Sequence, residues 1–162
     1  MVEAARSGPR TAFALSQLGS YVSDAFARAV REVGLTPSEA GVLRLLSREP
    51  GLSQRELATR LGTQPSRVVA LVDGLERRGL VVRTRSESDR RNYELRTTDA
   101  ARELGPRLRA IAEAHEDAVL APLTAAEREQ LARLVTKLAA GHGLDAELHR
   151  EMRAGSRRDA SG

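Results

Sequence analysis

Two short amphipathic segments that meet at a glycine constrain this fold more than any other part of the chain. Residues 53–61 and 64–78 carry apolar side chains at three- and four-residue steps, which indicates two short helices. Ala58 supplies a small side chain where the helices cross, Gly62 the turn, and Val68 a β-branched residue beneath the crossing. A tight turn between steeply crossing helices needs these residue types at this spacing. The sequence therefore predicts a helix-turn-helix, a motif that places its second helix in the major groove of DNA.

The starts of both segments carry residues that begin helices. Ser53 and Glu56 form a capping box, in which the hydroxyl and the carboxylate each satisfy an amide of the first turn. Pro65 stands in the first turn of the second helix, where a missing amide N–H costs nothing.

The second helix presents small and hydrogen-bonding side chains opposite its apolar stripe. At 100° per residue, Ser66, Ala70 and Arg77 lie opposite the stripe that runs from Val68 to Leu75. Such a face fits the major groove better than it fits another protein. A helical hairpin with an ordinary solvated face is the alternative interpretation.

An arginine-rich β-hairpin is expected directly after the second helix. Residues 80–85 and 93–97 are short β-prone runs around a polar turn at 86–92. Seven arginines lie between positions 77 and 96 against three acidic residues, giving 7 − 3 = +4, and the whole chain also carries +4. Positive charge concentrated on a protruding loop is typical of a surface that binds a polyanion. These arginines are Arg77, Arg78, Arg83, Arg85, Arg90, Arg91 and Arg96.

Several stretches of the chain resemble the multiple-antibiotic-resistance regulator (MarR) family of bacterial transcription factors. They are GLTPSEAGVLRLL, LSQRELATRLG, QPSRVVALVDGLERRGLVVR and SDRRNYELRTT, and the resemblance covers roughly residues 11–140. The most specific pieces are VDGLERRGLV and the wing motif Asp89-Arg90-Arg91. The resemblance implies that the second helix reads the major groove and that the wing tip enters the minor groove. It also implies that Arg91 makes or orients the wing contact, while Asp89 braces the wing through the adjoining arginines.

The chain departs from the family pattern on the second helix. The family often carries Thr and Arg where this chain has Val69 and Ala70, and often Arg where it has Gly74. Base-specific contacts are therefore expected nearer the start of the helix, from Gln64, Ser66 and Arg67. The full set of predicted DNA-binding residues is Ser53, Gln54, Gln64, Pro65, Ser66, Arg67, Ala70, Arg77, Arg78, Arg85, Asp89, Arg90 and Arg91.

The segments on either side of the helix-turn-helix predict long helices with more apolar surface than one small domain can cover. The helix expected over residues 10–33 holds three of the four aromatic residues, and part of its stripe should meet a partner subunit. A helix from Asp99 onward contains Gly105-Pro106, where a kink or a break is expected. Another helix begins at Thr124, which forms a capping box with Glu127.

The predicted fold is mainly α with a small β-hairpin wing, a winged helix-turn-helix joined to a helical dimerisation region. A two-fold dimer matches an inverted-repeat DNA site whose half-sites lie about 34 Å apart, or a multiple of that distance. The expected division is a disordered N-terminus at 1–9, a dimerisation helix at 10–33, the winged helix-turn-helix at 34–98, C-terminal dimerisation helices at 99–140, and a short helix and/or disordered tail at 141–162.

The sequence offers no support for catalysis or metal binding. There is no cysteine, which excludes disulfides and a thiol redox switch. His142 and His149 lie near Asp145 and Glu147, but their spacing favours a solvated tail over a metal site. Without a Gly-rich phosphate loop or a nucleophile elbow, no enzymatic activity, cofactor or metal is expected. No apolar run could span a membrane and no signal peptide is present, so a cytoplasmic protein is expected.

The function predicted from these features is that of a sequence-specific regulator of transcription, most often a repressor, which binds double-stranded DNA as a homodimer. The resemblance implies release from DNA by a small aromatic or anionic effector, which would bind between the first helix and the DNA-binding region. The alternative hypothesis is a winged-helix protein-interaction module that does not touch DNA. Candidate effector-binding residues are Phe13, Tyr21, Arg28 and His115.

Overall fold

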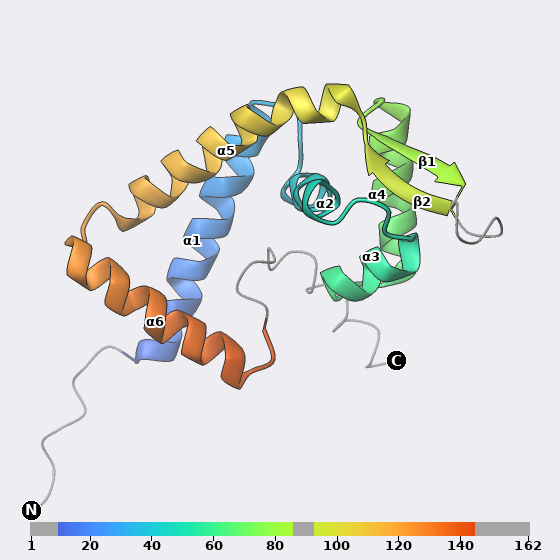
Figure 1. Ribbon diagram of the computed structural model, residues 1–162. Helices are drawn as coiled ribbons and strands as arrows, with labels where there is room; N and C mark the ends of the chain where they lie inside the picture. The colour runs from blue at the N-terminus through green and yellow to red at the C-terminus, as the bar shows by residue number, and fades with distance from the viewer. Residues whose placement is uncertain (1–9, 86–92, 145–162) are drawn as a thin grey trace, which may run out of the picture.

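The computed structural model describes residues 10–85 and 93–144, and their arrangement confirms the predicted mainly helical fold with one β-hairpin. Figure 1 shows two regions, with α2, α3, α4 and the hairpin on one side and α1, α5 and α6 on the other. We call the first the winged region and the second the terminal helices. The elements in chain order are α1 Thr11–Arg31, α2 Pro37–Arg48, α3 Gln54–Leu61, α4 Pro65–Arg77, β1 Val81–Arg85, β2 Tyr93–Thr97, α5 Asp99–Leu120 and α6 Ala125–Gly141.

Three helices begin at capping boxes, and two of these, at Ser53 and Thr124, were predicted from the sequence. In three capping boxes, a Ser or Thr hydroxyl accepts from the amide of a glutamate three residues on, and that carboxylate accepts from the amide of the cap. The amide of Ser53 donates to Glu56 at 2.8 Å, and this bond lowers the pKa of the Glu56 carboxyl. Gly62 ends α3 with a φ of 58°, a left-handed conformation that glycine adopts without strain. The boxes are Thr36 with Glu39, Ser53 with Glu56, and Thr124 with Glu127.

A single apolar core fills the winged region and reaches the neighbouring ends of two terminal helices. Val30 from α1 and Ala101 from α5 join buried residues of α2, α3, α4 and both strands. Burying a Leu or Val side chain fully contributes about 1.5–3 kcal/mol. This core therefore fixes α4 and the hairpin relative to each other. Its fully buried side chains are Val30, Leu35, Val42, Leu46, Leu57, Leu61, Val68, Val72, Leu75, Val81 and Leu95.

The hairpin is anchored at its base by the loop between α2 and α3. Strands β1 and β2 are antiparallel, from Val81 opposite Thr97 to Arg85 opposite Tyr93. On the other edge of β2, Leu95 donates its amide to the Leu52 carbonyl at 2.9 Å and accepts from the Gly51 amide at 3.0 Å. The start of α3 is thereby tied to the wing through backbone bonds.

The break expected in the helix after the wing does not occur. α5 runs without interruption from Asp99 to Leu120 with Pro106 inside it. Leu104, Leu108 and Ile111 pack against the core on both sides of the proline, so tertiary packing compensates for the missing backbone hydrogen bond. Figure 1 shows the helix changing direction along its length, in agreement with the predicted alternative of a kink.

Three predictions concern residues outside the described ranges: the N-terminus at 1–9, the wing tip at 86–92, and the tail from 145. Within the described ranges, no helix combines the length and the apolar composition needed to cross a membrane.

Candidate nucleic-acid interface

α4 presents to solvent the face that the sequence predicted for it. Three fully buried side chains anchor the helix on the core, and Ser66, Ala70 and Arg77 lie on the opposite side. Gln64 and Pro65 are exposed at the start of the helix, and Arg67 is partly buried. Val69, an apolar residue, is also exposed there. The buried residues are Val68, Val72 and Leu75, and the exposed predicted residues are Gln64, Pro65, Ser66, Ala70 and Arg77.

Ser53 and Gln54, at the start of α3, both have partners within the fold. The Ser53 hydroxyl accepts from the Glu56 amide at 3.2 Å and donates to the Glu56 carboxylate at 2.7 Å. In the amide orientation that satisfies both groups, the Gln54 oxygen accepts from Nε and Nη2 of Arg83 at 2.9 and 2.7 Å. The Gln54 side chain therefore faces the wing strand.

Arg78 braces the start of α2 against the end of α4. Its guanidinium donates to the Glu39 carboxylate at 3.1 Å and to the Gly34 carbonyl at 2.8 Å. Along the chain, Arg78 is separated from Glu39 by 39 positions and from Gly34 by 44 positions, so these bonds join distant segments. Arg78 was predicted to contact DNA; in the structure its guanidinium has these two intramolecular partners, and its side chain is 38% exposed.

Two arginines of the hairpin also pair with carboxylates. Arg83, in β1, binds Asp73 and Glu76 of α4, and Arg96, in β2, binds Glu94 at 2.9 Å. Glu94 is already subtracted in the count of +4 for residues 77–96, but Asp73 and Glu76 lie outside that window, so the count overstates the charge that this region offers to a polyanion. By contrast, Arg85 is exposed at the end of β1, where the wing begins.

The sequence analysis missed the cluster around Arg83, although the strand pattern contained a signal. Val81 and Arg83 are two residues apart in β1, and such residues point to the same face of a strand. Because Val81 is buried in the core, an arginine on the same face needs a partner inside the protein.

The remaining predicted wing residues, Asp89, Arg90 and Arg91, lie outside the described ranges. The strands that lead to them are described. Figure 1 shows the hairpin projecting beyond α4, away from the terminal helices.

Three of the four candidate effector-binding residues lie exposed on α1, and the fourth lies on α5. Phe13 and Tyr21 are 65% and 61% exposed, and Arg28 is also exposed on α1. His115 of α5 is partly buried, with its ring 5.4 Å from that of Phe26 of α1. This burial lowers the pKa of His115, although the nearby Glu116 acts in the opposite direction.

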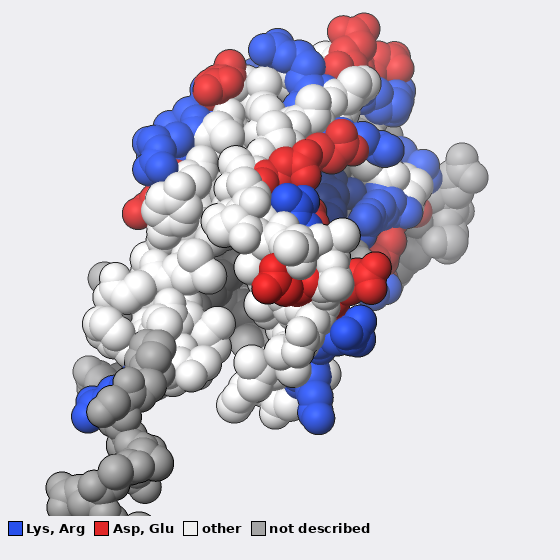
Figure 2. Space-filling view, turned by 90° about the vertical axis from the view of Figure 1, so that its left-hand side faces the viewer, with Lys and Arg blue, Asp and Glu red and all other residues white. Residues whose placement is uncertain are grey.

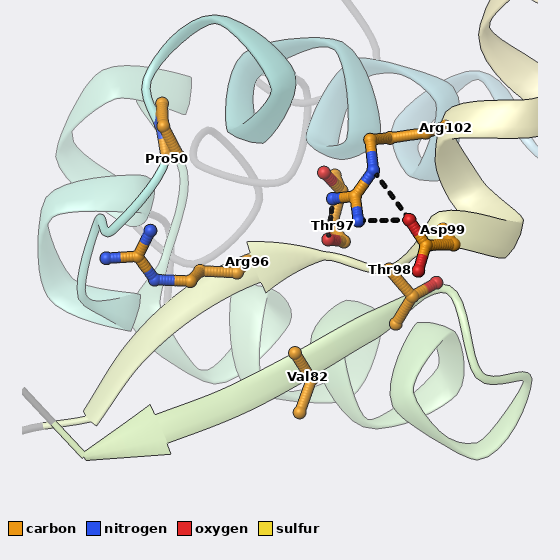
Figure 3. Close-up of a pocket in the computed structure, with 7 residues that line it drawn as sticks. All are labelled: Pro50, Val82, Arg96, Thr97, Thr98, Asp99 and Arg102. Atoms are coloured by element: carbon orange, nitrogen blue, oxygen red, sulfur yellow. Dashed lines mark hydrogen bonds and ion pairs between the residues drawn. The ribbon is translucent and has the colours of Figure 1, made fainter.

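A shallow depression at the base of the wing lies apart from these four residues (Figure 3). In it, Arg102 pairs with Asp99 at the start of α5 and donates to the Thr97 carbonyl at 2.9 Å. The guanidinium facing the depression is therefore already bound. The lining residues are Pro50, Val82, Arg96, Thr97, Thr98, Asp99 and Arg102.

Comparison with known proteins places these features in a family. A MarR family profile matches residues 33–92. The repressor Rv2887 of Mycobacterium tuberculosis is 33% identical over 126 residues, which cover 78% of this chain and 91% of the relative. The chain belongs to the MarR family. This family consists of transcriptional regulators and not of enzymes.

Solved structures of MarR family relatives match over most of the chain. The repressor CouR bound to a 23-mer DNA duplex is 40% identical, with a TM-score of 0.72, and the match covers 79% of this chain and 91% of that one. CouR from Rhodococcus jostii RHA1 has also been solved with p-coumaroyl-CoA, at 33% identity, a TM-score of 0.69, and coverage of 81% and 92%. Rv2887 has been solved with p-aminosalicylic acid, at 32% identity, a TM-score of 0.65, and coverage of 82% and 99%.

Proposed function

We propose that this MarR family protein is a transcriptional repressor that binds an inverted-repeat operator as a homodimer and leaves it when a small effector binds. The observation that carries this proposal is the exposed face of α4 beside a projecting hairpin, on a chain similar to a repressor solved on duplex DNA. A protein whose target is chromosomal DNA acts in the cytoplasm of a bacterial cell.

The proposed DNA surface divides into a major-groove part and a wing part. In the major groove, the exposed start of α4 supplies hydrogen-bonding side chains, and Val69 and Ala70 supply apolar contacts of the kind that recognise a thymine methyl group. Arg85 and the wing tip supply positive charge, which suits a narrow minor groove. The proposed major-groove residues are Gln64, Pro65, Ser66, Arg67, Ala70 and Arg77; Ser53 and Gln54 lie beside the phosphates; the wing residues are Arg85, Asp89, Arg90 and Arg91.

The terminal helices support the proposed homodimer. No residue of α6 is buried, and the helix exposes three large apolar side chains, while α1 exposes four more. Figure 2 shows the molecule from the left-hand side of Figure 1, and the white surface in its lower left part has almost no charged side chains. An uncharged apolar surface of this kind is stabilised when a second subunit covers it. The exposed residues are Phe13, Leu15, Leu18, Tyr21, Leu134, Val135 and Leu138.

We infer that the effector is an aromatic carboxylic acid or a thioester of such an acid. CouR has been solved with p-coumaroyl-CoA and Rv2887 with p-aminosalicylic acid, and both ligands contain an aromatic ring and anionic groups. In this chain, Phe13, Tyr21 and His115 offer rings and Arg28 offers a positive charge.

The experiment that tests DNA binding is fluorescence anisotropy with duplexes selected by the protein from a random pool. The control is a scrambled duplex of the same base composition. We expect tighter binding to the selected duplex, and an affinity that falls with salt with a logarithmic slope of about −0.9 for each phosphate contacted. Equal binding to both duplexes would contradict sequence-specific recognition, and no binding to either duplex would favour the protein-interaction module.

The same assay tests the effector proposal. Addition of p-coumaroyl-CoA, p-coumarate or p-aminosalicylate to the preformed complex should lower the affinity for the selected duplex, with coenzyme A alone as the control. Full retention of DNA binding with all three compounds would contradict the proposed class of effector.

A further inference from the structure

A single arginine joins the wing strand to the helix proposed to enter the major groove. The guanidinium of Arg83 binds the carboxylates of Asp73 and Glu76, and its Nε and Nη2 donate to Gln54 at 2.9 and 2.7 Å. Its side chain is 21% exposed, whereas those of Asp73 and Glu76 are 51% and 40% exposed. The arginine is therefore enclosed by the groups that it binds, and all three of its nitrogens donate inward.

The two carboxylates lie where negative charge opposes DNA binding. Asp73 is three residues after Ala70 and four before Arg77, so it shares their exposed face of α4. Glu76 follows Asp73 by three residues and lies beside it on the helix. Unpaired carboxylates on a helix that enters the major groove would repel the phosphates on either side.

We propose that Arg83 is a positioning residue for DNA binding, which binds Asp73 and Glu76 and offsets one of their two negative charges without itself contacting DNA. Its guanidinium donates to both carboxylates and to Gln54, so each of its three nitrogens already has a partner within the protein and only one N–H, on Nη1, is left over. The same contacts hold β1 against α4 and the start of α3. This inference rests on the proposed DNA-binding function and adds a residue to it.

The decisive experiment is a charge rescue. Arg83→Met removes the positive charge and the donors while it keeps the length of the side chain. We expect this variant to bind the selected duplex about tenfold more weakly at about 0.1 M salt, because two carboxylates are left uncompensated. Asp73→Asn and Glu76→Gln, added to Arg83→Met, remove that repulsion and should restore the affinity to within about threefold of the original protein.

The matched control is Arg102→Met, which also removes an arginine that is paired with a carboxylate, Asp99 of α5. It changes the net charge equally but lies outside the surface of α4, so it should alter DNA affinity by less than about twofold. Circular dichroism and thermal melting establish whether each variant is folded. If Arg83→Met does not fold, the triple variant is compared directly with the original protein, and its affinity for the selected duplex should again lie within about threefold of the original.

The outcomes separate this inference from the proposed function. Failure of the original protein to bind any selected duplex would overturn the function. If the original protein binds, the inference is overturned when Arg83→Met binds equally well. It is also overturned when the triple variant remains tenfold weaker, since that result assigns Arg83 a direct contact with DNA.

Discussion

The winged region and the terminal helices consist of similar amphipathic helices, but they differ in what covers their apolar faces. In α2, seven of 12 residues are buried by neighbouring elements of the same chain. In α6, none of 17 residues is buried, although Leu134, Val135 and Leu138 recur at helical spacing. The apolar pattern therefore predicts that one face of each helix is buried in a contact. Only the packing shows whether that contact is made within the same chain.

This difference divides the molecule by function. The winged region has its own core, so α4 and the hairpin keep their relative positions within one subunit. The terminal helices would complete their packing in the homodimer, which sets the distance between two copies of α4. Movement of the terminal helices can therefore alter DNA binding without unfolding the winged region.

The largest expected effect is a loss of stability from the core of the winged region. Leu75 is fully buried on the inner face of α4. Leu75→Ala should lower the free energy of unfolding by about 2–5 kcal/mol, because it removes buried apolar surface and leaves a cavity. Urea denaturation followed by circular dichroism measures the change. Leu134→Ala, on the exposed face of α6, is the control, and an equal loss of stability at low protein concentration would contradict the contrast between the regions.

A weaker dimer without loss of fold is the next effect in size. Leu138 is exposed on the apolar face of α6, and Leu138→Glu would place a charge in the proposed interface. We expect the dimer to be weakened by about 2 kcal/mol, roughly thirtyfold in its dissociation constant, as measured by analytical ultracentrifugation. Thr136→Glu, on the opposite face of the same helix, should leave the dimer intact. A similar shift in both variants would indicate a general charge effect.

Sequence preference should depend on the start of α4. Arg67→Ala should cost about 1–3 kcal/mol on the selected duplex and relax the preference at one base position if Arg67 contacts a base edge. Selection from a random pool, repeated with the variant, reports that preference. Equal weakening on selected and scrambled duplexes would show that Arg67 contacts a phosphate.

The smallest effect expected is a pH dependence that arises between α1 and α5. Burial against Phe26 lowers the pKa of His115, so the folded protein binds a proton there less readily than the unfolded chain does. The contribution of this group to stability is therefore complete above its ordinary pKa of 6.5 and declines as the pH falls below that value. The melting temperature of His115→Gln should fall less between pH 7.5 and pH 5.5 than that of the original protein. An identical fall in both would contradict the assignment.

Features that depend on neighbours in sequence were predictable. Capping boxes join residues three positions apart, the αL cap at Gly62 follows from a missing side chain, and the buried stripe of α4 follows from helical periodicity. The exposed face of α4, and with it most of the major-groove candidates, was predicted for the same reason.

Features that depend on distant partners were not predictable. Seven arginines could be counted between positions 77 and 96, but the partner of Arg78 is 39 residues away and that of Arg83 lies on another element. A kink or a break was expected at Pro106, and which of the two occurs was decided by apolar contacts on both sides of the proline, which keep α5 continuous.

The sequence by itself determined the helix boundaries, the helix-turn-helix and the family, because local backbone preferences and helical periodicity depend only on residues that are close in the sequence. Only the tertiary structure decided which charges are free to meet DNA and which apolar faces remain uncovered. Both depend on where distant segments come together: an ion pair neutralises Arg83 only where α4 lies beside β1, and α6 stays largely exposed because the described elements of its own chain bury none of its residues.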